Sequence, residues 1–363
     1  MKESQVLGHY ASGRDNNFNL LRMLAAIGVL VSHAYPISLG AEAQEPLEGF
    51  LDGITLGGLS VLIFFSISGF FITKSFVFSV SWQRFLVARA LRLFPALFVV
   101  LTVTIVFAGV FMTTVPHEFW SAAPGYLLRN LTLVKLEHSL PGVFDGNPYG
   151  TAINGSLWTL FYEVICYAGI FVGGILGILH RPRLFALSLG VVVLLCLIMP
   201  YLPVHSRLQS LSKLALPFAI GAGLFLWRDL IPLSLLAVAI LALLTWGLHG
   251  TEAFRPVFVL TLSYSVFVLG YWPSVSFQNY NRLGDYSYGT YIYAFPVQQL
   301  VASSGVADPL INMAIALPIT LICAALSWHL IERVALEFKP RSSTASARQA
   351  HDQRLQFQDE RGL

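Results

Sequence analysis

The chain has 363 residues, of which 56% are hydrophobic and only 11% charged, with a mean hydropathy of +0.69 and a net charge of +3. Soluble domains carry roughly 25% charged residues, so this composition excludes an ordinary soluble protein and indicates a chain that lies mostly in lipid. The positive charge falls largely in predicted loops and in the polar end of the chain, so it does not indicate a nucleic-acid surface.

Long hydrophobic runs recur along the chain, and each is long enough to cross a hydrocarbon core about 30 Å thick. They predict an all-α fold, a multi-pass membrane bundle of about ten transmembrane helices. The predicted spans are 19–38, 53–76, 91–112, 155–178, 184–202, 211–227, 231–248, 256–272, 286–305 and 310–331.

The connections between these spans are short except for residues 113–154, where four prolines lie among aromatic and charged residues. Within this loop the sequence predicts an interfacial helix around residues 118–131. Residues 1–338 are therefore expected to form one membrane domain. Residues 339–363 are expected to form a polar, disordered cytoplasmic tail.

The distribution of Lys and Arg predicts the orientation, because cytoplasmic loops carry an excess of both. With both termini in the cytoplasm, sixteen of the 22 basic residues fall in cytoplasmic segments and Arg22 falls within a span. The remaining five would lie in outer loops; they are Arg129, Lys135, Arg207, Lys213 and Arg255. We therefore predict that both ends are cytoplasmic.

Cysteine spacing indicates neither a metal site nor a disulfide. Cys166, Cys196 and Cys323 lie in separate apolar spans, which is typical of packing residues. No bound metal or cofactor is expected.

Two ionisable residues fall inside the first predicted span, where they are costly and therefore indicate function. His33 follows Arg22 by 11 positions, about three helical turns plus roughly 20°, so both should lie on one helix face about 16 Å apart. A long anionic substrate such as a coenzyme A thioester would suit this spacing, with its phosphates at Arg22 and its reactive end near His33, a candidate general base. Alternatively, Arg22 reaches the lipid headgroups and His33 bonds a neighbouring helix.

Arg89 and Arg92 lie at the predicted cytoplasmic entry to the third span. Residues three apart share a helix face, so the two guanidinium groups can bind one anionic group together. The alternative is that they only set the topology.

Glu163 is expected about two turns into the fourth span from the outer side, at a depth similar to that of His33. It could orient the imidazole, stabilise its protonated form or bind an acceptor hydroxyl, or it could be a structural partner of another helix.

Six segments together resemble the acyltransferase-3 family of membrane O-acyltransferases. They are Arg22 and His33 with ten residues between them, Ser68-Gly-Phe-Phe71, Arg89-x-x-Arg92-x-x-Pro95, Ser156-Leu-Trp-Thr-Leu-Phe-Tyr-Glu163, Gly284-Asp-Tyr-Ser-Tyr288 and Ile331-Glu332-Arg333. The likeness extends to about Phe338, in a stand-alone form without a soluble hydrolase-like domain.

The resemblance implies a cytoplasmic acyl-CoA donor, usually acetyl-CoA, and an acceptor hydroxyl on an extracytoplasmic glycan or lipid-linked sugar. Arg22 and His33 match the family's essential pair, Arg89 and Arg92 match its arginine motif, and Glu163 stands in a motif usually placed beside the site. Many members have a histidine before the proline of the ninth-span motif, where this chain has Phe295 before Pro296.

These observations predict an O-acetyltransferase of the bacterial inner membrane in which His33 acts as general base. Direct transfer and a covalent acyl-histidine relay both remain open. The competing classes are a transporter or flippase for a polar lipid or solute, and an inactive scaffold.

Overall fold

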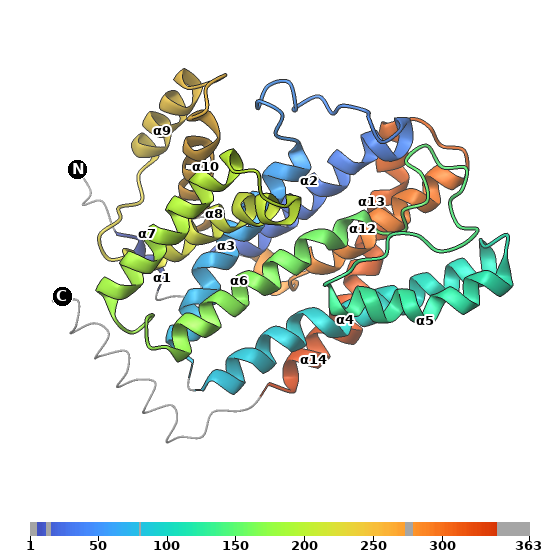
Figure 1. Cartoon of the computed structure of the whole chain (residues 1–363), viewed down its shortest axis with the longest axis horizontal. Coiled ribbons are helices and arrows are strands. Elements are labelled where there is room, and N and C mark those ends of the chain that lie inside the picture. Colours follow the sequence, from blue (N-terminus) through green and yellow to red (C-terminus); the bar gives the residue numbers. More distant parts are fainter. Residues whose placement is uncertain (1–5, 12–15, 80, 273–278, 340–363) are drawn as a thin grey trace.

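The computed structural model describes residues 6–11, 16–79, 81–272 and 279–339. Within these ranges the chain is helical, with no strand beyond one isolated bridge between Val6 and Pro232 (Figure 1). The helices are α1 Leu7–Ala11, α2 Phe18–Leu39, α3 Leu56–Val77, α4 Trp82–Phe111, α5 Pro116–Thr132, α6 Trp158–Ile175, α7 Pro182–Ile198, α8 Ser206–Leu226, α9 Leu235–Gly247, α10 Phe254–Gly270, α12 Ser287–Ser303, α13 Pro309–Ser327 and α14 Arg333–Glu337. Four short turns complete the described fold, namely the 3₁₀ turns η1 Gly155–Leu157, η2 Met199–Tyr201 and η3 Asn279–Arg282 and the π-helical turn η4 Trp328–Glu332.

The predicted all-α membrane fold is confirmed, and each predicted span corresponds to a helix. Seven helical segments of the described chain are long and apolar enough to cross a membrane: Phe18–Leu39, Leu56–Val77, Trp82–Phe111, Gly155–Ile175, Pro182–Tyr201, Ser206–Leu226 and Pro309–Glu337. The other three predicted spans correspond to the shorter helices α9, α10 and α12. The count of ten spans and the cytoplasmic placement of both ends remain predictions.

Helix α4 begins earlier than expected. The span was predicted from residue 91, but the helix starts at Trp82 because the Ser81 hydroxyl accepts a hydrogen bond from the backbone N–H of Arg84 and caps its first turn. Arg89 and Arg92 therefore lie inside a 30-residue helix, about two to three turns after its first residue, rather than at its start.

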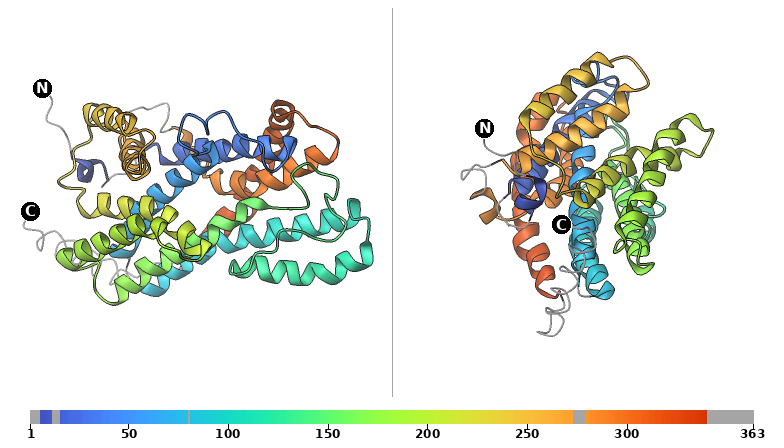
Figure 2. Two further views of the ribbon diagram at one scale, coloured as in Figure 1. Left: turned by 45° about the horizontal axis from the view of Figure 1, so that its top comes forward. Right: turned by 90° about the vertical axis from the view of Figure 1, so that its left-hand side faces the viewer.

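Helix α5 confirms that the long loop contains a helix near residues 118–131, while its interfacial position stays a prediction. It lies beside α4 (Figure 2), and Phe119 and Tyr126 are buried on its inner face. The predicted polar tail of residues 339–363 lies outside the described residues except for Lys339.

Small residues allow the central helices α3 and α8 to pack closely. A Cβ atom on Gly69 would collide with the carbonyl oxygen of Phe218, and one on Gly221 with that of Ser66. Such close backbone approach is typical of helix pairs in membranes. Helix α3 also packs against α2, α6 and α10, so side chains from several parts of the chain converge around it.

Candidate functional site

Arginines from two helices converge in a small cavity of about 110 Å³, which we call the arginine cavity. Arg22 comes from α2, Arg89 and Arg92 from α4, and Glu163 from α6. The structure thus brings together four of the five residues that the sequence singled out. Arg89 and Arg92 were expected to bind one anionic group together and Arg22 to bind the donor phosphates; all three line this cavity, and the binding of an anion there stays a prediction.

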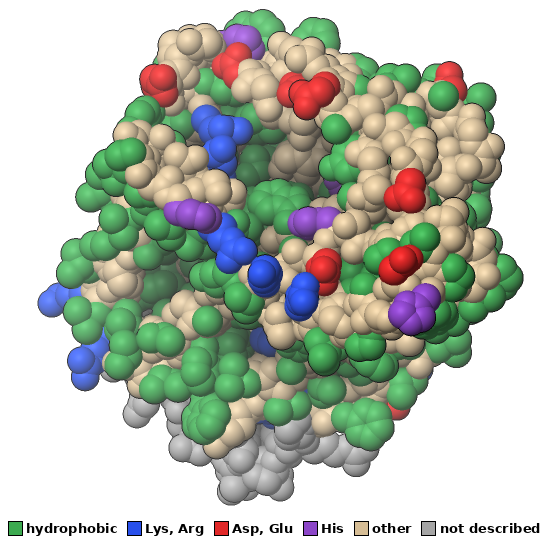
Figure 3. All heavy atoms as spheres, turned by 45° about the vertical axis from the view of Figure 1, so that its right-hand side comes forward, with side chains coloured by type: hydrophobic (Ala, Val, Ile, Leu, Met, Phe, Trp, Pro, Cys, Tyr) green, Lys and Arg blue, Asp and Glu red, His purple; other side chains and the backbone are tan. Residues whose placement is uncertain are grey.

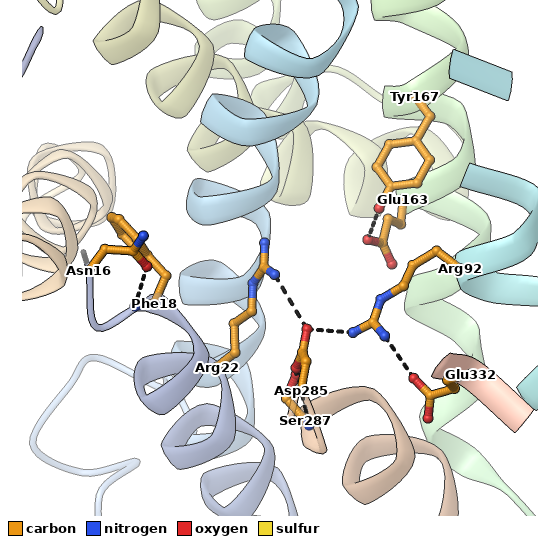
Figure 4. A network of polar contacts seen from close by, with 9 residues as sticks. All are labelled: Asn16, Phe18, Arg22, Arg92, Glu163, Tyr167, Asp285, Ser287 and Glu332. Carbon is orange, nitrogen blue, oxygen red and sulfur yellow. Dashed lines mark hydrogen bonds and ion pairs between the residues drawn. The ribbon is translucent and has the colours of Figure 1, made fainter. Parts of the chain in front are cut away.

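Two of the arginines are joined by carboxylates from the C-terminal third of the chain (Figure 4). Arg92 donates hydrogen bonds to Asp285 Oδ2 at 2.6 Å and to Glu332 Oε2 at 2.7 Å. Arg22 Nη1 lies 3.7 Å from the same Asp285 oxygen. Asp285 therefore stands between two guanidinium groups, in a position that any other anion bound to both would have to share.

Hydrogen bonds fix both carboxylates in place. Asp285 precedes α12, and its Oδ1 accepts a hydrogen bond from the Ser287 hydroxyl at 2.5 Å. Glu332 lies on the π-helical turn η4 with only 1% of its side chain exposed, and its Oε1 accepts a hydrogen bond from the Ser327 hydroxyl at 3.0 Å. These extra partners offset part of the cost of burying charge.

Arg89 differs from the other two arginines. No described acidic side chain lies within ion-pair distance of it, and its buried Nε has no hydrogen-bond partner among the described residues. The nearby Glu163 carboxylate instead accepts a hydrogen bond from the Tyr167 hydroxyl. Arg89 therefore offers an unused hydrogen-bond donor inside the cavity.

His33 lies in a second, larger cavity of about 1040 Å³, the histidine cavity. Its Nδ1 is buried without a hydrogen-bond partner in the described chain, and its ring packs edge-to-face against Phe295, with centroids 5.2 Å apart. Trp158, Lys213 and Arg255 also line this cavity. The space-filling view shows a hollow in one face of the molecule, with hydrophobic, basic, acidic and histidine side chains around it (Figure 3).

Lys213 and Arg255 give the histidine cavity a basic character. Neither forms an ion pair with a described acidic side chain, whereas Glu252 on the same wall accepts a hydrogen bond from the Tyr201 hydroxyl at 3.0 Å. A negatively charged ligand in this cavity would find two available cations.

The two cavities adjoin. Val61 of α3 and Tyr291 of α12 line both of them, so Arg22 and His33, on one helix, face two compartments with a shared wall. The prediction that a single helix presents a cation and an imidazole to the interior thus agrees with the structure.

Glu163 is not beside His33. It lies with the arginines, and no described hydrogen bond or ion pair connects it to the imidazole, so the expected orientation of His33 by this carboxylate is absent from this structure. Its proposed role in catalysis stays a prediction.

Sequence reasoning missed Asp285 and undervalued Glu332. Both residues stand in quoted motifs to which the sequence assigned no role. Glu332 forms an ion pair with Arg92, which is 240 positions away. The available signal was that both acids border predicted apolar spans, where a charge usually has a partner.

Comparisons with known proteins identify the family of the chain. Residues 15–329 match the acyltransferase domain that defines the acyltransferase-3 family. An O-acetyl transferase of Shigella phage Sf6 is 30% identical over 339 residues, covering 91% of this chain and 98% of the relative. Nodulation protein 10 of Rhizobium leguminosarum bv. viciae is 29% identical over 373 residues, covering 91% and 95%.

No solved structure matches the chain. The family match spans most of the sequence and includes the segments that supply Arg22, His33, Arg89, Arg92, Glu163 and Asp285. The protein belongs to the acyltransferase-3 family and is an acyltransferase with a membrane-type helical fold.

Proposed function

We propose that the protein is an O-acetyltransferase of the cytoplasmic membrane, which transfers an acetyl group from cytoplasmic acetyl-CoA to a hydroxyl of an extracytoplasmic glycan or lipid-linked sugar. The observation that carries the proposal is the pair of adjoining cavities, one with three arginines and the other with His33 and a much larger volume. The similarity to a phage O-acetyl transferase supports acetyl as the transferred group.

The arginine cavity suits part of the donor rather than all of it. Its volume of about 110 Å³ is small for a nucleotide, since whole-ligand pockets typically measure roughly 300–1,000 Å³. We place the narrow pantetheine arm in this cavity and the phosphates at its mouth. There Arg89 can donate hydrogen bonds to phosphate oxygens, whereas Arg92, whose two Nη atoms are bonded to Asp285 and Glu332, contributes mainly positive charge.

The histidine cavity suits the acceptor because it is large, partly apolar and basic. Cys196, Leu197 and Val259 contribute apolar walls, whereas Lys213 and Arg255 contribute positive charge. An acceptor that combines sugar hydroxyls with a negatively charged group or a lipid anchor matches these surfaces.

His33 is the group we assign as general base. The acceptor hydroxyl oxygen forms a new bond to the thioester carbonyl carbon, the carbon–sulfur bond breaks, and the hydroxyl proton passes through the imidazole to the departing CoA sulfur. The products are the acetyl ester and free CoA thiol. Because no described group holds Nδ1, a group brought by substrate or water would have to orient the ring.

Release of CoA thiol from acetyl-CoA by the purified protein in detergent tests this proposal without knowledge of the acceptor. Wild type should release thiol slowly in the absence of acceptor, and His33→Ala should abolish release. Arg22→Ala should weaken acetyl-CoA binding. The control is His117→Ala, at an exposed position on α5 away from both cavities, which should behave as wild type.

The same assay can contradict the proposed function. If wild type neither binds acetyl-CoA nor releases thiol, the donor assignment fails. A transporter or flippase would then explain the charged cavities better, because transport requires no thioester chemistry.

A further inference from the structure

The wall between the two cavities contains Val61 of α3 and Tyr291 of α12. In the described chain these are the residues that line both cavities, and they are only 8% and 6% exposed. Any group that travels from the arginine cavity to His33 therefore passes between or beside these side chains.

Tyr291 is held rigidly. Its hydroxyl lies 2.8 Å from the carbonyl oxygen of Ser156, to which it can only donate, and 2.6 Å from the Thr159 hydroxyl. Since a phenol has one proton, Thr159 must be the donor in the second bond. Phe64 also packs edge-to-face against the ring, with centroids 5.8 Å apart. Two hydrogen bonds and a ring contact make this side chain a fixed wall rather than a swinging gate.

The side chain of Val61 is also restricted in its rotation. A β-branched side chain within a helix strongly prefers one χ1 rotamer, so its two methyl groups cannot rotate away without strain. With both side chains restricted, the space beside them between the two cavities cannot widen easily.

We infer that Val61 and Tyr291 form the passage through which the thioester end of the donor reaches His33, and that the passage selects unbranched acyl groups. The inference rests on the proposed function and adds a specificity determinant to it. An acetyl or straight-chain acyl group is no wider than the cysteamine arm that follows it. An acyl group branched at the carbon next to the carbonyl is wider and would meet the Val61 methyl groups or the Tyr291 ring.

Butyryl-CoA and isobutyryl-CoA provide the sharpest comparison because they have the same atoms and differ only in branching. Wild type should release CoA faster from butyryl-CoA than from isobutyryl-CoA. Val61→Ala removes two methyl groups from the passage and should raise the isobutyryl-to-butyryl ratio of turnover about tenfold, the usual effect of a small change in pocket width. If wild type accepts only acetyl-CoA, isobutyryl turnover should appear in Val61→Ala.

Val61→Phe should close the passage and abolish CoA release from acetyl-CoA. Binding of adenosine 3′,5′-bisphosphate, the nucleotide half of CoA, checks that this variant remains folded, because that probe has no arm to reach the passage. Val103→Phe makes the same change at a position of α4 that is 53% exposed and lines neither cavity, and it should behave as wild type.

The outcomes separate this inference from the proposed function. If wild type releases CoA from acetyl-CoA but the branched-to-linear ratio is unchanged in Val61→Ala, or Val61→Phe binds the bisphosphate and still turns over normally, the passage is elsewhere. Equal rates of CoA release by wild type from isobutyryl-CoA and butyryl-CoA also overturn the inference. If wild type releases no CoA at all, the proposed function itself fails.

Discussion

Arg92 of α4 and Asp285, at the start of α12, lie 193 positions apart in the sequence and form an ion pair of 2.6 Å. Arg92 also binds Glu332, and Asp285 also approaches Arg22. The pair thus connects α2, α4, α12 and the end of α13 around one cavity. In this arrangement Arg22 and Arg92 line the candidate donor site and also join the helices through their contacts with Asp285 and Glu332.

Asp285→Asn should destabilise the protein, because the substitution removes the negative charge between two partly buried arginines. Removing one partner of a buried ion pair typically costs about 3–5 kcal/mol, and we expect the lower end, since Arg92 is 23% and Asp285 13% exposed. Thermal unfolding in detergent measures the effect. Glu118→Gln, at an exposed position of α5, is the control, and equal midpoints for the two variants would show that the pair contributes little.

Arg89→Ala should weaken CoA binding while leaving stability nearly unchanged. Arg89 forms no ion pair with a described acidic side chain, but it would lose a charge-assisted bond to the donor phosphate, worth about tenfold in affinity. Calorimetric titration with CoA measures the change, and Arg183→Ala on the exposed surface of α7 is a matched control. Unaltered affinity in Arg89→Ala would place the phosphates elsewhere.

Glu163→Gln distinguishes two roles for this carboxylate. Because Glu163 lies with the arginines and apart from His33, the substitution should leave measurable turnover and should tighten CoA binding by removing a negative charge near the donor phosphates. Steady-state kinetics with acetyl-CoA tests this. A loss of turnover as complete as that of His33→Ala, with unchanged CoA affinity, would instead support the direct catalytic role predicted from the sequence.

Gly69→Ala should be among the most destabilising small substitutions in the chain. The new methyl group would meet the backbone of α8 at Phe218, which cannot move independently, so we expect a loss of about 1–3 kcal/mol. Gly190→Ala on α7 is the control: no atom lies within 4 Å of its added Cβ, and Ala favours a helix by about 1 kcal/mol over Gly. Opposite shifts of the two unfolding midpoints are expected, and similar shifts would contradict the packing argument.

Most of the helical elements were predictable because hydropathy is a local property. A continuous apolar run indicates a span wherever its partners lie, and the predicted runs correspond to helices across the described chain. The start of α4 was misplaced because polar residues such as Arg84 and Arg89 lower the hydropathy of its first turns without interrupting the helix.

The site could be predicted only in part. Arg22, His33 and Glu163 were singled out because a charge in an apolar span indicates a partner or a function, and Arg89 because it lies three residues from Arg92 at the entry to a span. The pairing of Arg92 with Asp285 and Glu332 could not be found in this way, since it depends on how α4 is rotated against α12 and α13. The same holds for Glu163, which was correctly placed within a span but faces the arginines rather than His33.

By itself the sequence determined that this chain folds as a bundle of membrane-type helices and which of its few ionisable residues would be costly to bury, since both follow from the composition of short segments. Only the tertiary structure decided that those residues divide between two cavities, with Val61 and Tyr291 in the wall between them. Such a division depends on helix crossings and side-chain packing between distant segments, which no local stretch of sequence specifies.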